Sequence, residues 1–324
     1  MEQILNQLKK SKRLLLTSHI HPDGDAIGSL LAMGLTLEAM KKDVMLFNES
    51  PTPAVYQFLP SIHRIKNEPG DMGAYDTAIV LDCSDLQRIG DMAVAVSNIP
   101  TVINIDHHIT NTRFGNYQLI DAKASATAEI IYRIIKALDI PITMAMAYAV
   151  YTGIMADTGS FRFSNTTPDA FRICHEMVGY GADAHKVAHH VYETISLNRI
   201  KLLNMVFDTI ELTENGKLSI MTLTQNMLQV TGTEIADVNG LINYAKRIEN
   251  VKVAALLYER KNGRCRSNRE SQFHVSLRSD GAIDVSLIAS SFGGGGHISA
   301  AGFDICSTLP ELKKQLYALS NRIR

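Results

Sequence analysis

The sequence predicts an α/β protein in which a mostly parallel sheet, flanked by helices, is followed by a smaller α/β domain. Short apolar runs at residues 13–18, 77–81 and 101–105 are typical of strands that are buried on both faces. Each run leads into a polar loop, and helical patterns lie between and after the runs. Because strands that alternate with helices form parallel sheets, we expect these runs to share one sheet.

The other elements of the first part follow from the spacing of apolar residues. A short helix is expected at residues 2–12, before the first strand, and another at 30–40, after the loop HIHPDGDAIGS. Residues 44–47 predict a further strand. Longer helical patterns cover residues 126–138 and 144–155. This order completes the alternation of strands and helices that a parallel sheet requires.

The pattern changes near residue 195 and predicts a second domain. Two strands are expected around the turn Glu214-Asn215-Gly216, and further strands at residues 251–258 and 273–277. The chain then contains FGGGGHISAAGF, a glycine cluster too concentrated for an ordinary turn. Since no low-complexity linker intervenes, we expect the two domains to face each other across a cleft. The expected bounds are 1–195 for the first domain, 196–212 for a connecting helix and 213–324 for the second domain.

Composition and charge limit the partners of the chain. Of its 324 residues, 46% are hydrophobic and 20% are charged, as expected of a globular protein with a sizeable core. The net charge of −1 provides no global positive field, which argues against duplex DNA but allows a short substrate held by a few cations. No apolar run approaches the ~20 residues that span a bilayer, so no membrane partner is expected.

Cysteine usage and the N-terminal segment predict a cytoplasmic protein. Cys83, Cys174, Cys265 and Cys306 are widely spaced and form no CxxC pair. This spacing argues against a secreted disulfide framework and against a structural zinc site. The first residues, MEQILNQLKKSKRLLL, lack the pattern of a secretory signal.

A candidate metal site begins in the first loop, where His19, Asp23 and Asp25 stand close together around a tight Pro-Asp-Gly-Asp turn. Their oxygen and imidazole donors suit Mn²⁺ or Mg²⁺, and the absence of a thiolate argues against a softer metal. An ordinary surface turn is the alternative for this loop taken alone.

Polar residues at the ends of later elements favour the metal site. Asp82 follows one apolar run in VLDCSD, and Asp106-His107-His108 follows another in VINIDHH. Because the carboxyl ends of parallel strands meet at one edge of a sheet, we expect these side chains to lie beside the first loop. Asp157 follows a helical pattern of small and apolar residues. Removing a carboxylate from water in such surroundings costs free energy, so its presence there indicates a specific role.

Six motifs, taken in order, resemble those of one protein family. HIHPDGDAIGS, VLDCSD, VINIDHH and GIMADTGSFRFSN resemble motifs I to IV of the DHH phosphoesterase superfamily. FHVSLRS and FGGGGHISAAGF resemble the DHHA1 subdomain that often follows. The resemblance covers nearly the whole chain. The layout is most similar to the short bacterial oligoribonucleases that also act as 3′-phosphoadenosine-5′-phosphate phosphatases.

The resemblance implies a site with two divalent metal ions, Mn²⁺ first and Mg²⁺ or Co²⁺ as alternatives. It implies that His108 faces the substrate phosphate and that Asp106 orients the neighbouring histidine, so that Asp82, Asp106 and His108 are the expected catalytic residues. The expected metal ligands are His19, Asp23 and Asp82 for one ion, and Asp25, Asp82, His107 and Asp157 for the other.

The second domain is expected to bind the substrate. Backbone N–H groups of Gly294, Gly295 and Gly296 would cradle phosphate oxygens, with a strained turn as the alternative. Arg278 and His297 are candidate contacts to a terminal phosphate, with a solvated strand-end charge as the alternative for Arg278. The resemblance also implies a nucleotide contact by Ser279. Three further cations precede FHVSLRS and are expected at a hairpin tip outside the site: Arg264, Arg266 and Arg269.

These expectations predict a metal-dependent hydrolase of very short RNA, such as dinucleotides, that releases nucleoside 5′-monophosphates. Removal of the 3′-phosphate of adenosine 3′,5′-bisphosphate is expected as well. A phosphodiesterase for linear or cyclic dinucleotides is the alternative with the same catalytic residues. An inorganic pyrophosphatase is disfavoured by the GGGGH sequence, and a non-catalytic nucleotide sensor by the complete ligand set. The motifs leave open whether the protein forms a homodimer.

Overall fold

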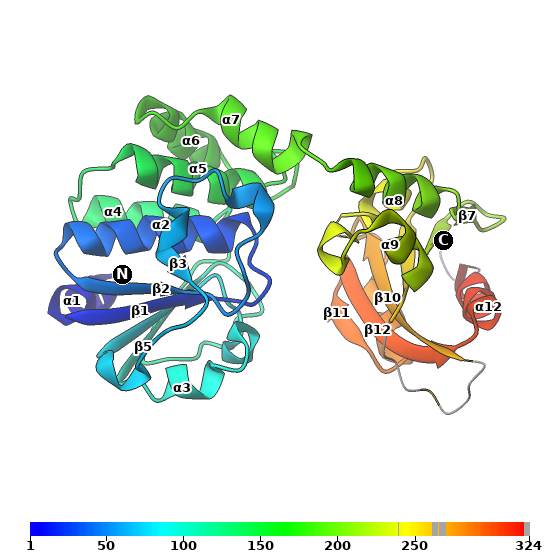
Figure 1. The fold of residues 1–324 in the computed structure, drawn as a ribbon, viewed down its shortest axis with the longest axis horizontal. Helices are drawn as coiled ribbons and strands as arrows, with labels where there is room; N and C mark the ends of the chain where they lie inside the picture. Colours follow the sequence, from blue (N-terminus) through cyan, green and yellow to red (C-terminus); the bar gives the residue numbers. More distant parts are fainter. Residues whose placement is uncertain (239, 261–264, 266–269, 321–324) are drawn as a thin grey trace. The chain divides into compact units, whose positions relative to one another are not determined.

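The computed structural model describes residues 1–238, 240–260, 265 and 270–320, and it divides into two compact units, Met1–Thr194 and Ile195–Arg324 (Figure 1). Arg264, Arg266 and Arg269 lie outside the described residues. Among the described helices, none has the length and apolar character that crossing a membrane requires.

The first unit is built on a six-stranded parallel sheet, and its strands at 13–18, 44–47, 77–81 and 101–105 confirm the prediction. Ser18 pairs with Leu81, and Leu81 pairs with Ile105, so three strands end in register. The next residue along each of these strands therefore reaches the same edge. The strands, in their order across the sheet, are β3 (Ile65–Lys66), β2 (Asp43–Phe47), β1 (Arg13–Ser18), β4 (Thr77–Leu81), β5 (Thr101–Asp106) and β6 (Tyr117–Ile120).

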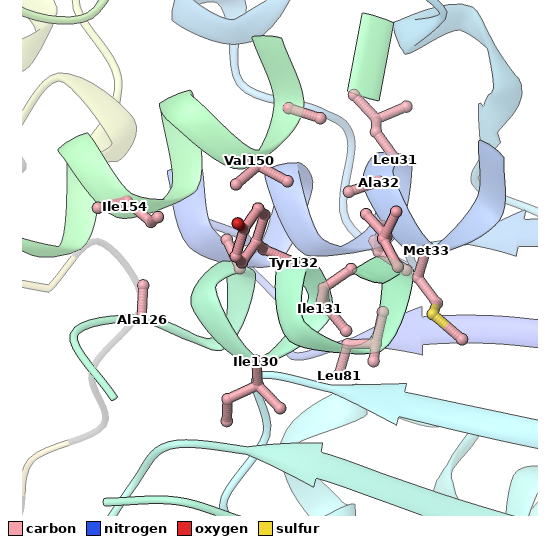
Figure 2. Close-up of a cluster of buried hydrophobic side chains, with 14 of the residues drawn as sticks. Leu31, Ala32, Met33, Leu81, Ala126, Ile130, Ile131, Tyr132, Val150 and Ile154 are labelled. Atoms are coloured by element: carbon pink, nitrogen blue, oxygen red, sulfur yellow. The ribbon is translucent and has the colours of Figure 1, made fainter. Parts of the chain in front are cut away.

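Helices cover both faces of this sheet. One face packs its aliphatic side chains against α2 and α4, where Leu81 lies near Ile131, and α5 packs on these two helices (Figure 2). The other face, which includes Leu15 and Val80, packs against α3 and the loops around it. The helices of the unit are α1 (Glu2–Lys10), α2 (Gly24–Ala39), α3 (Ala93–Ser97), α4 (Thr127–Ala137), α5 (Met144–Asp157), α6 (Pro168–Gly179) and α7 (Ala184–Ala188), followed by a π-helical turn, η5 (His189–Glu193).

Two glycines allow α2 and α5 to approach closely. A Cβ on Gly28 would lie 2.4 Å from the carbonyl oxygen of Ala149 on α5, and a Cβ on Gly153 would lie 2.9 Å from Oδ1 of Asp25 on α2. Any larger residue would separate the helices. The close contact brings the first turn of α2 next to the last turns of α5, the two places that carry Asp25 and Asp157.

The second unit contains a mixed six-stranded sheet. Its strands β8 and β9 run parallel, and every other neighbouring pair is antiparallel. The predicted strands at 251–258 and 273–277 are confirmed as β9 and β10, and the glycine cluster leads into the hairpin of β11 and β12. In order across the sheet, the strands are β11 (Gly295–His297), β12 (Ala300–Ser307), β10 (Ser271–Ser279), β9 (Val253–Glu259), β8 (Leu218–Leu223) and β7 (Glu211–Leu212).

The two faces of this second sheet are covered unequally. One face packs against α11 and α12 through residues such as Val275 and Leu277. The other face packs against α8, α9 and α10 where it carries Met221 and Leu256, on β8 and β9. These helices are α8 (Leu197–Phe207), α9 (Gln225–Thr231), α10 (Ile242–Lys246), α11 (Val285–Ser291) and α12 (Leu309–Ser320).

The second unit also contains a disulfide bond between Cys265 and Cys306. The cysteine spacing argued against a secreted disulfide framework, and it did not indicate this single bond. The two residues are 41 positions apart, but the fold brings their Cα atoms to 5.6 Å, within the range for a disulfide. Spacing along the chain reveals only local pairs, so this long-range pair gave no signal. Cys83 and Cys174 are buried free thiols.

Candidate metal centre

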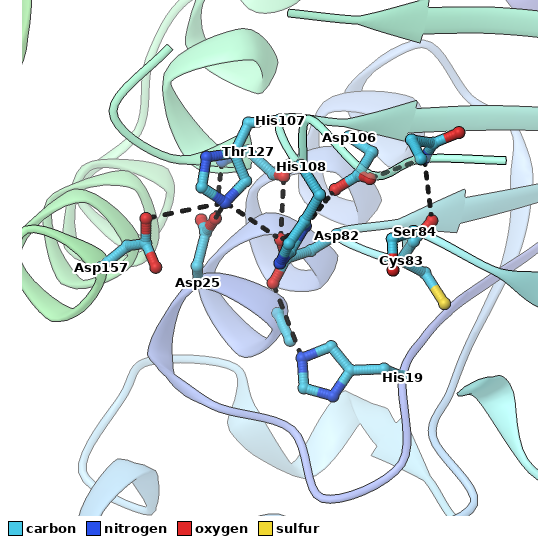
Figure 3. A network of polar contacts seen from close by, with 12 residues as sticks. His19, Asp25, Asp82, Cys83, Ser84, Asp106, His107, His108, Thr127 and Asp157 are labelled. Atoms are coloured by element: carbon cyan, nitrogen blue, oxygen red, sulfur yellow. Dashed lines mark hydrogen bonds and ion pairs between the residues drawn. The ribbon is translucent and has the colours of Figure 1, made fainter. Parts of the chain in front are cut away.

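Five segments of the first unit bring polar side chains to the carboxyl edge of the parallel sheet (Figure 3). His19, Asp82 and Asp106 stand at the aligned ends of β1, β4 and β5. The first turn of α2 adds Asp25, and the last residue of α5 is Asp157. The predicted convergence of these residues at one edge is therefore observed.

The donor atoms of this centre lie at distances that one ion can bridge. Nε2 of His107 is 3.7 Å from Oδ1 of Asp82, 3.6 Å from Oδ2 of Asp157 and 4.0 Å from Oδ2 of Asp25. Nε2 of His19 is 3.7 Å from the other oxygen of Asp82. Such separations exceed hydrogen-bond distances, but two ligands about 2.1 Å from one ion can be up to about 4.2 Å apart.

Among the described residues, three overlapping groups could each hold a metal ion. In each group, one donor atom per residue lies within 4.8 Å of the others. Asp82 belongs to two of the groups, so its two carboxylate oxygens could bridge neighbouring ions. The groups are His19, Asp23 and Asp82; Asp25, His107 and Asp157; and Asp82, His107 and His108.

The electrostatics of the centre also fit divalent cations. Burial, together with the charges of Asp82 and Asp157, raises the pKa of Asp25 well above its ordinary value. Burial raises the pKa of Asp157 to about 6. Burial also acts to raise the pKa of Asp82, but the neighbouring imidazoles outweigh it and lower that pKa to about 2. Crowded, buried carboxylates of this kind are stabilised as anions by bound metal.

The donor set is composed of oxygen and nitrogen atoms. Cys83 follows Asp82 directly, but its thiol donates a hydrogen bond to the carbonyl oxygen of Asp85. It belongs to none of the three groups. Carboxylate and imidazole ligands without thiolate suit Mn²⁺ or Mg²⁺. The residues present therefore fit two hard divalent ions.

The N-terminus of α4 holds two of the carboxylates in place. The backbone N–H groups of Thr127 and Ala128 donate to the two oxygens of Asp25 at 2.6 and 2.8 Å. The hydroxyl of Thr127 donates to Oδ1 of Asp82 at 3.1 Å. A helix N-terminus favours a negative charge, so α4 both orients and stabilises these ligands. Sequence reasoning missed Thr127, although a threonine at the start of a helical pattern is a recognisable signal.

Asp157 is oriented by Asn165, the last residue of the GIMADTGSFRFSN motif, which the sequence reasoning did not select. Nδ2 of Asn165 donates to Oδ2 of Asp157 at 3.1 Å and to the carbonyl oxygen of Ser125 at 2.9 Å. Between Asp157 and Asn165 the chain turns back through three consecutive residues in the left-handed conformation, Gly159–Phe161, with φ near +60°. Non-glycine residues adopt this conformation at a cost, so the turn is a strained connection beside the centre.

His108 is held by a carboxylate, as predicted. Its Nδ1 lies 2.7 Å from Oδ1 of Asp106, and this hydrogen bond is the largest cause of the raised pKa of His108. Nδ2 of Asn111 donates to the other oxygen of Asp106 at 2.6 Å. Asp106 is fully buried, whereas the His108 side chain is 32% exposed. The imidazole is therefore fixed through Nδ1, while its opposite edge is free to meet a substrate.

In the second unit, the sheet places two of the predicted substrate contacts on one face. Ala300 of β12 pairs with Arg278 on one side and with His297 on the other, so both side chains project from the same face. Arg278 is partly buried, which lowers the pKa of its guanidinium. Among the described residues, no carboxylate lies within ion-pair distance of it. A desolvated cation without a counter-charge is suited to bind an anion.

The other predicted contacts in this unit have structural roles. Ser279 is buried on the opposite face, and its hydroxyl donates to the carbonyl oxygen of Ile283 at 2.6 Å. A Cβ on Gly294 would lie 2.2 Å from the carbonyl oxygen of Gly302, and Gly296 has φ +145°. Packing of β11 against β12 thus accounts for glycine at 294 and 296. Gly295 is exposed, with open space where a Cβ would be.

Comparison with known proteins places both units in one family. Residues 13–154 match the DHH family, N-terminal domain, and residues 224–323 match the DHHA1 domain. A protein of Thermus thermophilus named bifunctional oligoribonuclease and PAP phosphatase NrnA is 33% identical over 291 residues, which are 89% of this chain and 83% of the relative. A protein of the same name from Bacillus subtilis is 26% identical and covers 94% of this chain and 93% of its own.

A solved structure agrees with this placement. The crystal structure of an exopolyphosphatase-related protein from Bacteroides fragilis superposes with a TM-score of 0.88 at 26% identity, covering 97% of this chain and 93% of that one. The motifs, the two domain matches and the similarity along nearly the full length agree, and the chain belongs to the DHH family of phosphoesterases, with a DHHA1 domain as its second unit.

Proposed function

We propose that this protein hydrolyses very short RNA, such as dinucleotides, to nucleoside 5′-monophosphates, and that it also removes the 3′-phosphate of adenosine 3′,5′-bisphosphate. The observation that carries the proposal is the convergence of three histidines and five aspartates at one sheet edge, with donor atoms spaced for two ions. Relatives from Thermus thermophilus and Bacillus subtilis, both named bifunctional oligoribonuclease and PAP phosphatase, support the choice of substrate.

In this proposal two Mn²⁺ ions would activate a water molecule and neutralise the charge on the phosphate. Asp82 would be a ligand of both ions, since its two oxygens face His19 and His107. The remaining ligands divide as the sequence motifs predict: His19 and Asp23 for one ion, and Asp25, His107 and Asp157 for the other.

His108 acts on the phosphate or on the leaving oxygen. Because Asp106 occupies its Nδ1, the imidazole presents Nε2 and can donate a hydrogen bond or a proton there. The raised pKa of His108 favours the protonated ring, which is the form that can donate. Asp106 keeps the ring in one orientation.

Arg278 and His297, in the second unit, bind a terminal phosphate of a nucleotide. Among the residues that the structure describes, Arg278 forms no ion pair, and the net charge of the chain is −1. A few local cations suit a short oligonucleotide better than a long one, because a long strand requires a continuous basic groove. We place this activity in the cytoplasm, with no membrane or duplex DNA partner.

A product time course with Mn²⁺ tests the proposal. The substrates are an RNA dinucleotide, a five-residue RNA, adenosine 3′,5′-bisphosphate, a cyclic dinucleotide and pyrophosphate. We expect fast conversion of the dinucleotide to monophosphates and slower release of phosphate from the bisphosphate. If only the cyclic dinucleotide or only pyrophosphate were cleaved, the metal centre would stand but the substrate proposed here would be wrong.

A further inference from the structure

The face of the second sheet that carries Arg278 and His297 continues along β10 and β12 as three rows of paired residues. We call the part formed by β10, β12 and β11 the open face, because on this side α8 and α9 pack on β8 and β9, and α10 extends only as far as β10. Its residues are half-buried or exposed. The rows are Arg278, Ala300 and His297; Ser276, Gly302 and Gly295; and His274 with Asp304.

The third row presents an imidazole in a fixed orientation. Nδ1 of His274 lies 3.1 Å from Oδ1 of Asp304, its direct partner on β12. The same oxygen accepts from Arg260 at 2.9 Å, so Asp304 is itself held in place. The His274 side chain remains 35% exposed. An aromatic ring that is oriented by a carboxylate and accessible to solvent is available for a ligand.

The ring lies across the neighbouring strand because residue 302 is glycine. A Cβ on Gly302 would lie 3.3 Å from Nε2 and 3.4 Å from Cε1 of His274, so any side chain there would push the ring away. The imidazole therefore rests over the backbone of β12 and points its Nε2 edge towards the middle row.

The middle row forms a flat floor between the two polar rows. Ser276, Gly302 and Gly295 are cross-strand neighbours, and none has a side chain larger than a hydroxymethyl group. Alternate residues of a strand are separated by about 7 Å, so the His274 row lies about 13–14 Å from the Arg278 row. The His274 ring reaches over Gly302 from one end of this interval, which is long enough for one nucleoside attached to a phosphate.

We propose that the open face is a nucleobase site, in which a terminal phosphate binds at Arg278 and His297 while the base stacks on the exposed face of the His274 ring, beside Gly295. This inference rests on the proposed function and adds a specificity element to it. Stacking on an aromatic ring accepts every base, because each base has a π-face. The site would favour nucleotides over other phosphates without selecting a sequence.

Direct binding tests the base contact without turnover. Adenosine 5′-monophosphate and ribose 5-phosphate are titrated into the full-length protein in EDTA, and heat or a fluorescence change reports the Kd. We expect the base to improve affinity about tenfold, within the range for one stacked base. His274→Ala should remove that advantage, and His274→Phe, which keeps a ring, should retain most of it. Asp304→Asn, which loosens the ring, should give a smaller loss.

His175→Ala is the matched control, since His175 is an exposed histidine on α6 of the first unit. It should bind both ligands as the unsubstituted protein does. Equal affinity of the unsubstituted protein for both ligands, or an unchanged base advantage in His274→Ala, would overturn the nucleobase site. Neither result depends on RNA hydrolysis. A protein that shows the base advantage but cleaves no RNA would instead contradict the proposed function.

Discussion

Asp82 is the residue on which both parts of the metal centre depend. Its Oδ2 faces His19 and its Oδ1 faces His107, each at 3.7 Å. Its backbone is left-handed, with φ +52°, a conformation that aspartate tolerates better than most residues. The carboxylate thus comes from a slightly strained turn at the end of β4, which directs it across the sheet edge.

Asp82→Asn should remove most of the metal and almost all activity. Asparagine keeps the size of the side chain and tolerates the same backbone, but it lacks the negative charge and the second strong donor oxygen. We expect activity to fall by at least about 10³-fold, with the far-ultraviolet circular dichroism unchanged. Bound manganese, measured by elemental analysis after dialysis, should fall as well. Asp43→Asn, an exposed aspartate paired with Arg13, is the control.

Thr127→Val tests the support given to Asp82. The substitution removes the hydroxyl that donates to Oδ1 but keeps the backbone N–H that binds Asp25. Since losing such an outer hydrogen bond costs about 10–100-fold in metal affinity, calorimetric titration with Mn²⁺ should show a weaker Kd in this range. Thr127→Ser retains the hydroxyl and should bind as before. Equal affinity of the valine and serine variants would show that the hydroxyl has no role.

At the scale of elements, the contact between α2 and α5 sets the geometry of the centre. Gly28→Ala should destabilise the protein by about 1–3 kcal/mol, because the new Cβ overlaps the carbonyl oxygen of Ala149 and forces the helices apart. Urea unfolding at equilibrium measures this change in the free energy of unfolding. Gly179→Ala, at the exposed end of α6 with no atom within 4 Å of the added Cβ, should be close to neutral. A neutral Gly28→Ala would mean that the helices have room to move.

The elements differ in how far the sequence could predict them. The strands ending at Ser18, Leu81 and Ile105 are local apolar runs, so both their position and the polar residues after them could be predicted. The resemblance of the motifs to those of the DHH superfamily supplied the expected metal ligands. The hydrogen bond from Thr127 to Asp25 spans 102 positions, and no local pattern indicates it.

Long-range packing also explains what was missed in the second unit. The glycines of β11 lie against β12, and Ser279 turns to the buried face because side chains alternate along β10. Likewise, the bond between Cys265 and Cys306 depends on strands that meet only in the folded sheet.

At the scale of the whole molecule, each unit has its own hydrophobic cores. The sheet of the first unit packs on both faces with residues of that unit alone, and the second unit does the same. All six expected metal ligands, from His19 to Asp157, belong to the first unit.

A fragment of residues 1–194 should therefore fold and bind Mn²⁺ with nearly the affinity of the full chain. Circular dichroism and calorimetric titration measure the two properties. The fragment should lose the binding of short nucleotides that the second unit is proposed to supply. A folded fragment that failed to bind Mn²⁺ would show that the second unit contributes to the metal centre.

The candidate metal ligands are far apart in the sequence, so the ribosome synthesises them at different times. His19 emerges first, but the backbone amides that orient Asp25 belong to Thr127 and Ala128, and Asp157 comes last. About 140 residues separate the first donor from the last, which corresponds to roughly 7–30 s of synthesis. The nascent chain cannot assemble the full ligand set in that interval. Metal loading therefore follows translation of the first unit, and a chelator present during synthesis should not prevent the protein from being charged with manganese afterwards.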